Sequence, residues 1–229
     1  MSAARQHVFL TGGSGYMGSR LIPRLLSRGH RVTALVRPHS EAKLPSGCEA
    51  VSGNALDASS YREHIKPATT FVQLVGVSHP SPAKAAEFRS IDLVAGREAI
   101  AAAVSAGIQH LIYVSVAHPA PMMKAYIAVR AECEALIRES GLNATILRPW
   151  YVLGPGHRWP YALVPAYWLL EHIPSTREGA QRLGLVTLDQ MLQALTDAVE
   201  SSSTGVHVLG VPEIRAGRAS ATFGAASAR

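Results

Sequence analysis

The segment from His7 to Gly18 constrains the fold most, because an apolar strand-like run ends in a glycine-rich turn that leads directly into a helical pattern. Gly12, Gly15 and Gly18 are each separated by two residues. Main-chain N–H groups at a helix N-terminus can bind a diphosphate only where no Cβ blocks its approach. In this arrangement the first glycine permits a tight turn, the second admits the phosphate and the third lets the helix pack on the sheet. The segment therefore predicts a dinucleotide-binding site.

The sequence around the turn supports this interpretation. Gly13, Gly15 and Gly18 also satisfy the looser pattern G-x-G-x-x-G, which is a weak signal when taken alone. The stretch from Ser19 to Ser27 then carries leucine and isoleucine at helical spacing, with arginines on the opposite side. The alternative is a glycine-rich turn that binds nothing. We expect the cofactor to be contacted by Gly12, Gly13, Ser14, Gly15, Tyr16, Met17 and Gly18.

Length and composition indicate one large α/β domain with a buried core, because 48% of the 229 residues are hydrophobic and 17% are charged. The sequence has no apolar run of the roughly 18 residues that span a bilayer and no apolar signal-peptide segment. We therefore expect a cytoplasmic protein without a membrane span. Cys48 and Cys133 are far apart, and no His-Glu-x-x-His pattern occurs, so we expect no metal site.

The formal net charge is +6, which raises the question of a nucleic-acid partner. Phosphate backbones are bound by clustered cations. Here the basic residues are scattered, are mostly arginine and are not interleaved with aromatic residues. We therefore expect a small-molecule substrate and an anionic cofactor, and no nucleic acid. The sequence does not define an oligomeric state.

Strand-like and helix-like segments alternate along the chain, which is typical of a Rossmann-type doubly wound parallel sheet of the α/β class. The expected strands are 8–11, 31–36, 50–52, 70–75, 109–115 and 143–147, and the clearest helices are 84–106 and 122–140. A further helix is expected at 187–200 and a further strand at 206–209.

The domain is expected to cover residues 1–212, with a small C-terminal extension in which 149–212 partly form a cap on the substrate side. Residues 153–160 read as a loop, and 161–172 form an apolar, aromatic segment that either covers the core or walls a substrate pocket. Residues 213–229 are rich in Ala, Gly, Ser and Arg and are expected to form a loosely ordered tail.

The end of the second strand bears on the choice of dinucleotide. An acidic residue there accepts hydrogen bonds from the ribose 2′-hydroxyl of NAD, whereas an arginine binds the 2′-phosphate of NADP. The strand ends at Val36-Arg37, which favours NADP, although an arginine can also stack on adenine and NAD stays possible. Asn54 and Ala55 follow the third strand, where the adenine is expected, and Asp57 is suited to cap the next helix.

Several motifs together resemble the atypical and extended short-chain dehydrogenase/reductases, an NAD(P)-binding group with NmrA-like, epimerase-like and complex I accessory-subunit-like members. The matching pieces are residues 11–18, 28–37, 74–76, 112–115 and 141–149. The resemblance covers residues 7–160 well and reaches weakly to about 210. It implies further cofactor contacts at Leu74, Val75, Gly76, Pro149 and Tyr151.

The resemblance also implies a catalytic set, from which this chain departs. The family uses a Tyr-x-x-x-Lys pair, whose members share one helix face, and here Tyr126 is followed by Arg130. A cation remains, but arginine hydrogen-bonds differently from lysine. The family's serine position best matches Val116, so Ser115 lies one residue early and would face the opposite side of the strand. We take Tyr126, Arg130 and Ser115 as the catalytic candidates, with His118 and His157 as alternatives for proton transfer.

The motifs and the family resemblance leave three alternative functions. The first is an NADP-dependent oxidoreductase acting on a small apolar carbonyl or quinone-like substrate. The second is a non-catalytic NADP(H)-sensing or assembly protein, which the missing lysine and displaced serine favour. The third is a nucleotide-sugar epimerase or dehydratase, which is disfavoured because little sequence remains after the sixth strand for the larger domain that grips a sugar nucleotide.

Overall fold

A computed structural model describes residues 5–156, 164–201 and 204–217. Its centre is a parallel sheet of seven strands in the order β3-β2-β1-β4-β5-β6-β9. The strands are β1 His7–Thr11, β2 Arg31–Val36, β3 Glu49–Ser52, β4 Thr70–Gln73, β5 His110–Val114, β6 Ala144–Leu147 and β9 Val206–Leu209. The strand order reverses between β1 and β4, where ligands bind in such folds. The expected Rossmann-type doubly wound sheet is confirmed.

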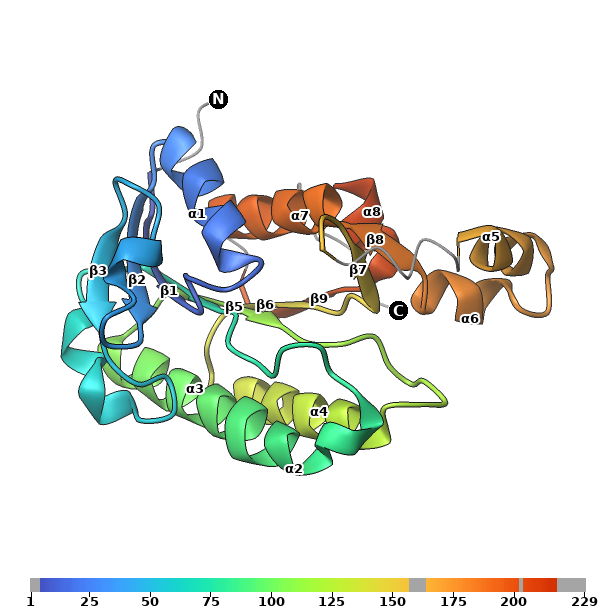
Figure 1. Cartoon of the computed structure of the whole chain (residues 1–229), viewed down its shortest axis with the longest axis horizontal. Helices are drawn as coiled ribbons and strands as arrows, with labels where there is room; N and C mark the ends of the chain where they lie inside the picture. Colours follow the sequence, from blue (N-terminus) through green and yellow to red (C-terminus); the bar gives the residue numbers. More distant parts are fainter. Residues whose placement is uncertain (1–4, 157–163, 202–203, 218–229) are drawn as a thin grey trace, which may run out of the picture.

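Helices cover both faces of this sheet (Figure 1). One face carries α1 Gly18–Ser27, α7 Leu188–Glu200 and α8 Val211–Ala216, and the other carries α3 Val94–Ala106 and α4 Lys124–Glu139. Because side chains alternate along a strand, Val8 and Leu10 join the apolar cluster under α1 and α7, whereas Phe9 joins the cluster under α3 and α4. The inner strands β1, β4, β5 and β6 are buried on both sides, which accounts for their mainly apolar composition, whereas the edge strand β3 is largely exposed.

The segment between β4 and α3 departs from the expected single helix over 84–106. It consists of the 3-10 turn η4 Pro82–Lys84, the short helix α2 Ala85–Glu87 and the π-helical segment η5 Phe88–Leu93 before α3 begins. β4 also ends at Gln73 rather than at Val75, so residues 74–78 form a loop beyond the edge of the sheet. Short π-helical insertions within helices are frequent at functional sites.

Other short elements complete the N-terminal half. They are the 3-10 turns η1 Glu41–Lys43, η2 Ala58–Ser60 and η3 Arg62–His64. The side chain of Asp57 accepts a hydrogen bond from the backbone N–H of Ser59 at 3.0 Å, so the expected capping role of this residue is confirmed. The cap fixes the chain just after the β3 loop, where adenine was expected.

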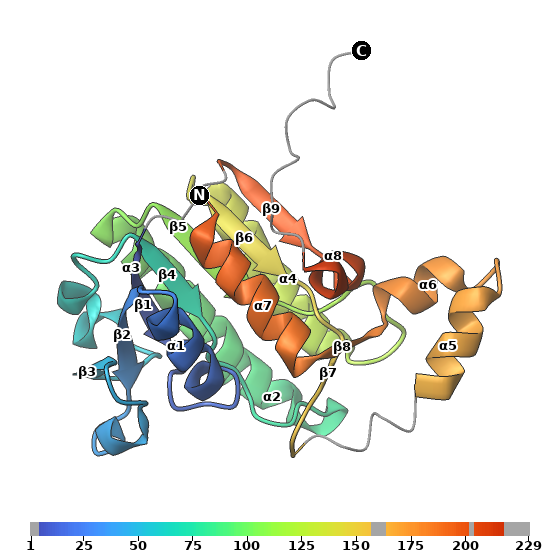
Figure 2. The same cartoon turned by 90° about the horizontal axis from the view of Figure 1, so that it is seen from above.

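Past β6 the chain forms a small second sheet of β7 Tyr151–Leu153 and β8 Leu185–Thr187, together with α5 Val164–His172 and α6 Arg177–Arg182. Figure 2 shows α5 and α6 next to each other at one side of the molecule, away from the main sheet, with α6 leading back to β8. The helix expected at 187–200 is present as α7, whose start is fixed by a capping box between Thr187 and Gln190. Residues 157–160, which include His157 and form the second half of the expected loop at 153–160, lie outside the described residues.

The boundary expected after residue 212 falls inside α8. This helix buries Val211 and Ile214 in the core, so residues 213–216 belong to the folded unit rather than to a loose tail. Sequence periodicity does not reveal α8, because a helix of six residues with two buried side chains is too short to show a repeating pattern. Residues 218–229 lie outside the described part of the chain.

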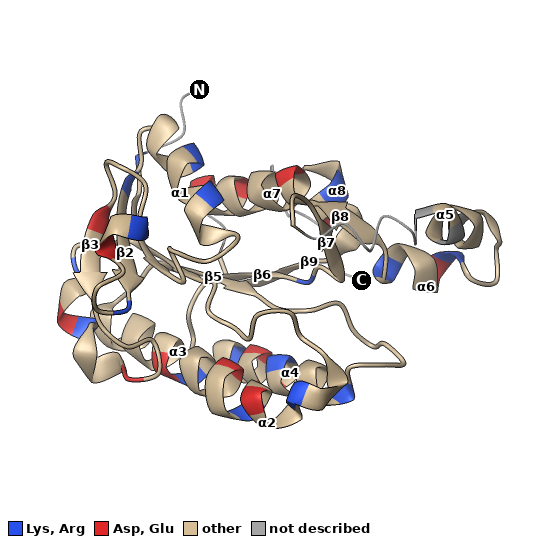
Figure 3. Cartoon of the chain, viewed as in Figure 1, with Lys and Arg blue, Asp and Glu red and all other residues tan. Residues whose placement is uncertain are grey.

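Two observations bear on partners. Within the described ranges, none of the helices combines the length and the apolar composition needed to cross a bilayer. Figure 3 shows Lys and Arg positions on several elements, including α1, α4 and α6, with Asp and Glu positions interspersed on α4 and α6.

Candidate functional site

The turn between β1 and α1 depends on the absence of side chains. Gly12 has a φ of +78°, which a residue with a Cβ rarely adopts. A Cβ at Gly18 would overlap the carbonyl oxygen of Gly12, and one at Gly13 would lie 2.8 Å from the Cβ of Ala34. The N–H of Gly15 donates to the carbonyl of Gly12 at 3.0 Å and closes the turn. The first turn of α1 therefore packs directly against the end of β1.

The N-terminus of α1 carries neither an acidic residue in its first turn nor a capping hydrogen bond from the side chain of Met17. The first N–H groups of a helix have no partner within the helix, and the helix dipole makes this end attractive to anions. A diphosphate is the ligand that such a glycine-lined helix start is suited to hold.

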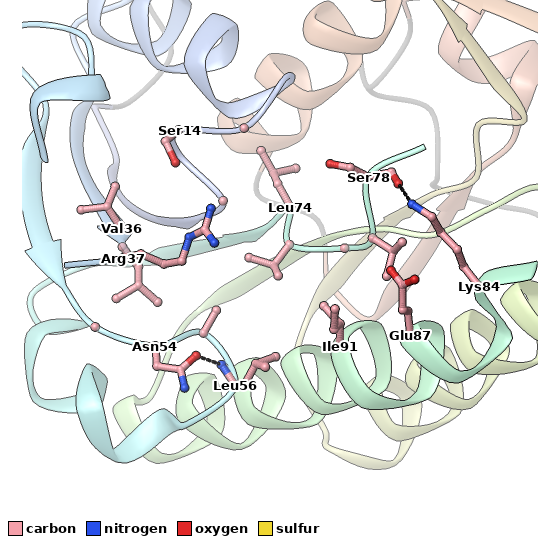
Figure 4. Close-up of a pocket in the computed structure, with 18 residues that line it drawn as sticks. Ser14, Val36, Arg37, Asn54, Leu56, Leu74, Ser78, Lys84, Glu87 and Ile91 are labelled. Atoms are coloured by element: carbon pink, nitrogen blue, oxygen red, sulfur yellow. Dashed lines mark hydrogen bonds between the residues drawn. The ribbon is translucent and has the colours of Figure 1, made fainter. Parts of the chain in front are cut away.

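A cavity of about 460 Å³ opens at this turn, beyond the ends of β1, β2 and β4 (Figure 4). Nine of the expected cofactor residues line it, namely Gly12, Ser14, Gly15, Arg37, Asn54, Ala55, Leu74, Val75 and Gly76. These residues come from the glycine turn and from the loops that follow β2, β3 and β4. The structure thus brings into one cleft the segments that the sequence analysis had assigned separately to the diphosphate, ribose and adenine.

Four expected contacts build the turn without lining this cavity: Gly13, Tyr16, Met17 and Gly18. Tyr16 and Met17 are half-buried and pack against the cluster under α7. The guanidinium of Arg20 lies 4.4 Å from the ring centre of Tyr16. Their arrangement holds the start of α1 in place, which is a supporting role for the cleft.

Arg37 and Asn54 lie at one end of the cleft (Figure 4). Arg37 is exposed and makes no salt bridge with any residue of the described ranges. The side-chain oxygen of Asn54 accepts the N–H of Leu56 at 3.0 Å, which shapes the loop after β3. The arginine charge at this end of the cleft is therefore available to an anionic group.

The opposite end of the cleft is also polar, which the sequence analysis missed. Lys84 donates from Nζ to the carbonyl of Ser78 at 2.7 Å, and Glu87 lies beside it (Figure 4). Ile91 continues the same wall. The sequence pattern predicts one continuous helix over 84–106. The structure interrupts this helix with η4, α2 and η5, so the pattern does not reveal that Lys84 and Glu87 face the cleft.

Tyr126 and Arg130 lie one turn apart on α4, as their spacing requires, but neither lines this cleft. The half-buried Tyr126 ring packs against Phe88, with ring centres 4.9 Å apart. The guanidinium of Arg130 lies 5.1 Å from the Tyr126 ring centre. The arginine therefore contacts the tyrosine through the face of its ring.

Arg130 is buried and its guanidinium is held from several sides. Nη2 is paired with the carboxylate of Asp92 in η5, and Nη1 donates to the carbonyl of Val114 at 2.9 Å and to the Tyr113 hydroxyl at 3.2 Å. Asp92 also accepts the N–H of Val77 at 3.0 Å. This pair supports the loop that forms one wall of the cleft.

Gly76 fits this arrangement, because a Cβ at this position would overlap Nη2 of Arg130. The backbone of the cleft wall therefore lies directly against the guanidinium. A bulkier residue at Gly76 would have to displace either the loop or the ion pair. The arginine that replaces the family's lysine is thus part of the wall itself.

Ser115 is buried, and its hydroxyl donates to Glu134 of α4 at 2.6 Å. Glu134 is also paired with Arg148 and Arg138, and lies 3.5 Å from Nε2 of His118. Burial alone would raise the pKa of the Glu134 carboxyl, but the hydrogen bonds from Arg148 and Ser115 outweigh burial and lower it. The hydroxyl of Ser115 therefore belongs to a buried carboxylate cluster on α4.

The two remaining expected contacts follow β6. The carbonyl of Pro149 accepts the N–H of Ala117 at 2.9 Å, which joins the loops after β5 and β6. Tyr151 lies in β7, half-buried beside Trp150 with ring centres 5.6 Å apart. Neither residue lines the 460 Å³ cleft.

In the described part of the chain, no three His, Cys, Asp or Glu side chains group closely enough to hold a metal ion.

Comparison with known proteins agrees with this geometry. A family model described as NAD(P)H-binding matches residues 12–162. A crystal structure of the Bordetella bronchiseptica enzyme WbmH in complex with NAD⁺ superposes with a TM-score of 0.67 at 20% identity, over 90% of this chain and 76% of that one. At this identity the likeness shows the fold alone.

Two curated relatives are reductases. The chain is 27% identical over 168 residues to the 4-hydroxy-2-methyl-3-oxo-4-farnesyl-3,4-dihydroquinoline-1-oxide ketoreductase of Stigmatella aurantiaca, covering 64% of this chain and 50% of that protein. It is 27% identical over 229 aligned residues to a 3-diazoavenalumate denitrifying reductase of a Streptomyces species, covering 88% of this chain and 75% of the relative. The chain therefore spans half the length of the first relative and three quarters of the second.

The buried pair yields a stability prediction. Arg130→Met removes the counter-ion of Asp92 and is expected to lower the free energy of unfolding by about 3–5 kcal/mol, because an unpaired buried charge is costly. The matched control is Arg97→Met, since Arg97 pairs with Glu132 of α4 at the surface, where loss of the pair costs about 1 kcal/mol or less. Urea unfolding measures both values. Equal small losses in the two variants would show that Arg130 does not support the wall.

Proposed function

Because the chain belongs to the NAD(P)H-binding family, we propose that it is an NADP(H)-dependent reductase that acts on a carbonyl or quinone-like group of a small apolar molecule. The observation that carries this proposal is the cleft itself. A side-chain-free helix start, an arginine at the end of β2 and a loop suited to adenine line one cavity. A dinucleotide requires all three of these features in one place.

The preference for NADP rests on Arg37. This side chain is exposed at the end of β2, lines the cleft and is free of salt bridges to the described acidic residues. A guanidinium binds a phosphate with paired, charge-assisted hydrogen bonds. We therefore place the 2′-phosphate of the adenosine ribose at Arg37, with Asn54 near the adenine.

The diphosphate is assigned to the backbone of Ser14 and Gly15, and the nicotinamide half to the end of the cleft beyond Gly76. When bound, the cofactor supplies a hydride to the substrate carbon. Excluding water from this end is the task of the surrounding chain, and residues 149–212 are proposed to contribute to it as a cap. Pro149 and Tyr151 belong to this segment.

Tyr126 is the proposed proton donor to the substrate oxygen. A phenol can transfer a proton where it touches the reacting oxygen. Arg130 does not replace the family's lysine in a simple way, because its guanidinium is bound to Asp92, Tyr113 and the carbonyl of Val114. Its proposed role is to fix the wall of the cleft and the ring of Tyr126. Ser115 is proposed to orient α4 through Glu134 rather than to bind substrate.

The carbonyl substrate class draws support from the first relative, and the second supports a reductase without pointing to a carbonyl. One is named as a ketoreductase of a farnesyl-bearing quinoline oxide and the other as a reductase of a diazo compound. A carbonyl on an apolar molecule is the group that hydride transfer and a tyrosine proton donor would reduce together.

A non-catalytic NADP(H) sensor is the second candidate. Two observations favour it: the hydroxyl of Ser115 is committed to Glu134, and the guanidinium of Arg130 is committed to Asp92. The residues at or next to the family's lysine and serine positions are thus both occupied by other contacts. The sensor would bind the dinucleotide in the same cleft but turn over no substrate.

The cofactor assignment predicts a charge-reversal effect. Arg37→Glu is expected to weaken NADPH binding by about tenfold or more, since it removes a charge-assisted contact and adds repulsion. NADH binding should change less, because NADH has no 2′-phosphate. Calorimetric dissociation constants for both nucleotides, on both proteins, measure the difference. Equal weakening of NADPH and NADH would contradict the phosphate-binding role of Arg37.

The catalytic assignment predicts turnover that depends on Tyr126. NADPH oxidation is followed with a panel of ketones, aldehydes and quinones. Tyr126→Phe is expected to lower kcat by about 100-fold or more while NADPH affinity stays unchanged, because only proton transfer is lost. Tyr61→Phe is the control for a general loss of packing, since Tyr61 is buried in the apolar cluster against which Tyr126 packs, and its hydroxyl has no hydrogen-bond partner among the described residues.

Three outcomes separate the candidates. Activity that falls only in Tyr126→Phe supports the reductase. Unchanged activity in that variant excludes Tyr126 as the proton donor. Tight NADPH binding without turnover of any panel member favours the sensor.

A further inference from the structure

A second cavity, of about 280 Å³, lies beyond the ends of β5, β6 and β9 and beside α6 and α8. It shares no lining residue with the dinucleotide cleft. His118 contributes from the loop after β5, Arg148 from the end of β6 and Arg182 from α6. Three side chains that can carry positive charge therefore meet in one small cavity.

Two side-chain nitrogen atoms in this cavity have no hydrogen-bond partner in the described part of the chain. Nε of Arg182 is buried and has no hydrogen-bond partner among the described residues. Nε2 of His118 is also buried without a hydrogen bond, and its nearest carboxylate oxygen, on Glu134, lies at 3.5 Å. A buried donor without an acceptor is unfavourable. A ligand that brings acceptor oxygens would satisfy both groups.

The acidic groups around the cavity do not neutralise Arg182. Glu134 is buried, does not line the cavity and is already paired with Arg148 and Arg138. Glu213 accepts the N–H of Gly210 at 2.9 Å and closes the first turn of α8. Glu178 lies 3.5 Å from Nη1 of Arg182, but its side chain is 95% exposed, so water screens this pair.

We propose that this cavity binds the carboxylate of a small organic acid. The Nε–H of Arg182 would donate one charge-assisted hydrogen bond, and His118 and the Gln181 amide, which also lines the cavity, would complete the contact. The cavity is at the lower end of the size of ligand pockets, which suits an acid with a few carbon atoms or one ring. Glu178 and Glu213 at the wall disfavour a doubly charged phosphate.

This site does not depend on the proposed redox activity, because none of its residues lines the dinucleotide cleft. The region of the proposed cap forms part of it, since Glu178, Gln181 and Arg182 of α6 line the cavity, and the N–H of Ala117 in its wall is bonded to the carbonyl of Pro149. An acid bound here would lie at the carboxyl edge of the sheet, where α/β folds bind ligands.

The test is calorimetric titration of the NADPH-saturated protein with benzoate, and with benzamide as the uncharged counterpart. NADPH blocks the diphosphate site, so binding there is excluded. Benzoate is expected to bind at least about tenfold more tightly than benzamide, because the amide lacks the negative charge. Arg182→Gln should weaken benzoate binding by about tenfold or more, through loss of the charge and of the Nε donor.

The matched control is Arg177→Gln, on the same helix but outside the cavity, which should leave benzoate affinity within about twofold. His118→Gln is a second variant that removes a donor from a different element. Far-UV circular dichroism and urea midpoints check that each variant folds. No binding of benzoate, equal binding of benzamide, or unchanged affinity in both Arg182→Gln and His118→Gln would overturn the proposal.

Discussion

The close contact between α1 and the turn after β1 is the constraint on which the site depends. A Cβ at Gly18 would overlap the carbonyl of Gly12, so the helix can start here only without a side chain. This contact directs the N-terminus of α1 toward the switch point between β1 and β4. The loops after β2 and β4 then lie on either side of it, and they bring Arg37 and Gly76 to the same cleft. In the proposed function, the backbone geometry of this turn binds the diphosphate, and Arg37 selects the nucleotide.

Buried ion pairs hold the walls around this cleft. Asp92 and Arg130 lie behind the loop at Gly76, and Glu134 and Arg148 join α4 to the end of β6. A buried charge is tolerated where its hydrogen bonds are made by fixed partners. These pairs therefore link α4 to η5 and to the end of β6. Arg130 therefore stabilises the fold through Asp92 and the carbonyl of Val114, and it also contacts the ring of Tyr126.

The sequence predicted what local pattern controls. The doubly wound parallel sheet, the glycine turn and the cleft-lining role of Arg37 and Asn54 follow from short motifs and from the rules of parallel sheets. The partner of Arg130 could not be predicted, because Asp92 lies 38 residues away in a π-helical segment that periodicity does not reveal. Ser115, which directly follows β5, donates to Glu134 of α4. This agrees with its one-residue offset from the family's serine position at Val116, since neighbouring positions along a strand point to opposite faces. Lys84 and the cavity at Arg182 likewise depend on tertiary contacts.

The most direct test of the central claim is a titration of ¹⁵N-labelled protein with NADPH, followed through the backbone amide resonances. If the helix start holds the diphosphate, the largest shifts occur at Ser14, Gly15 and Tyr16, with a second group at Arg37 and Asn54. Amides of β9, at the edge of the sheet opposite β3, should stay in place. Shifts confined to other parts of the chain, or none at saturating nucleotide, would contradict the account.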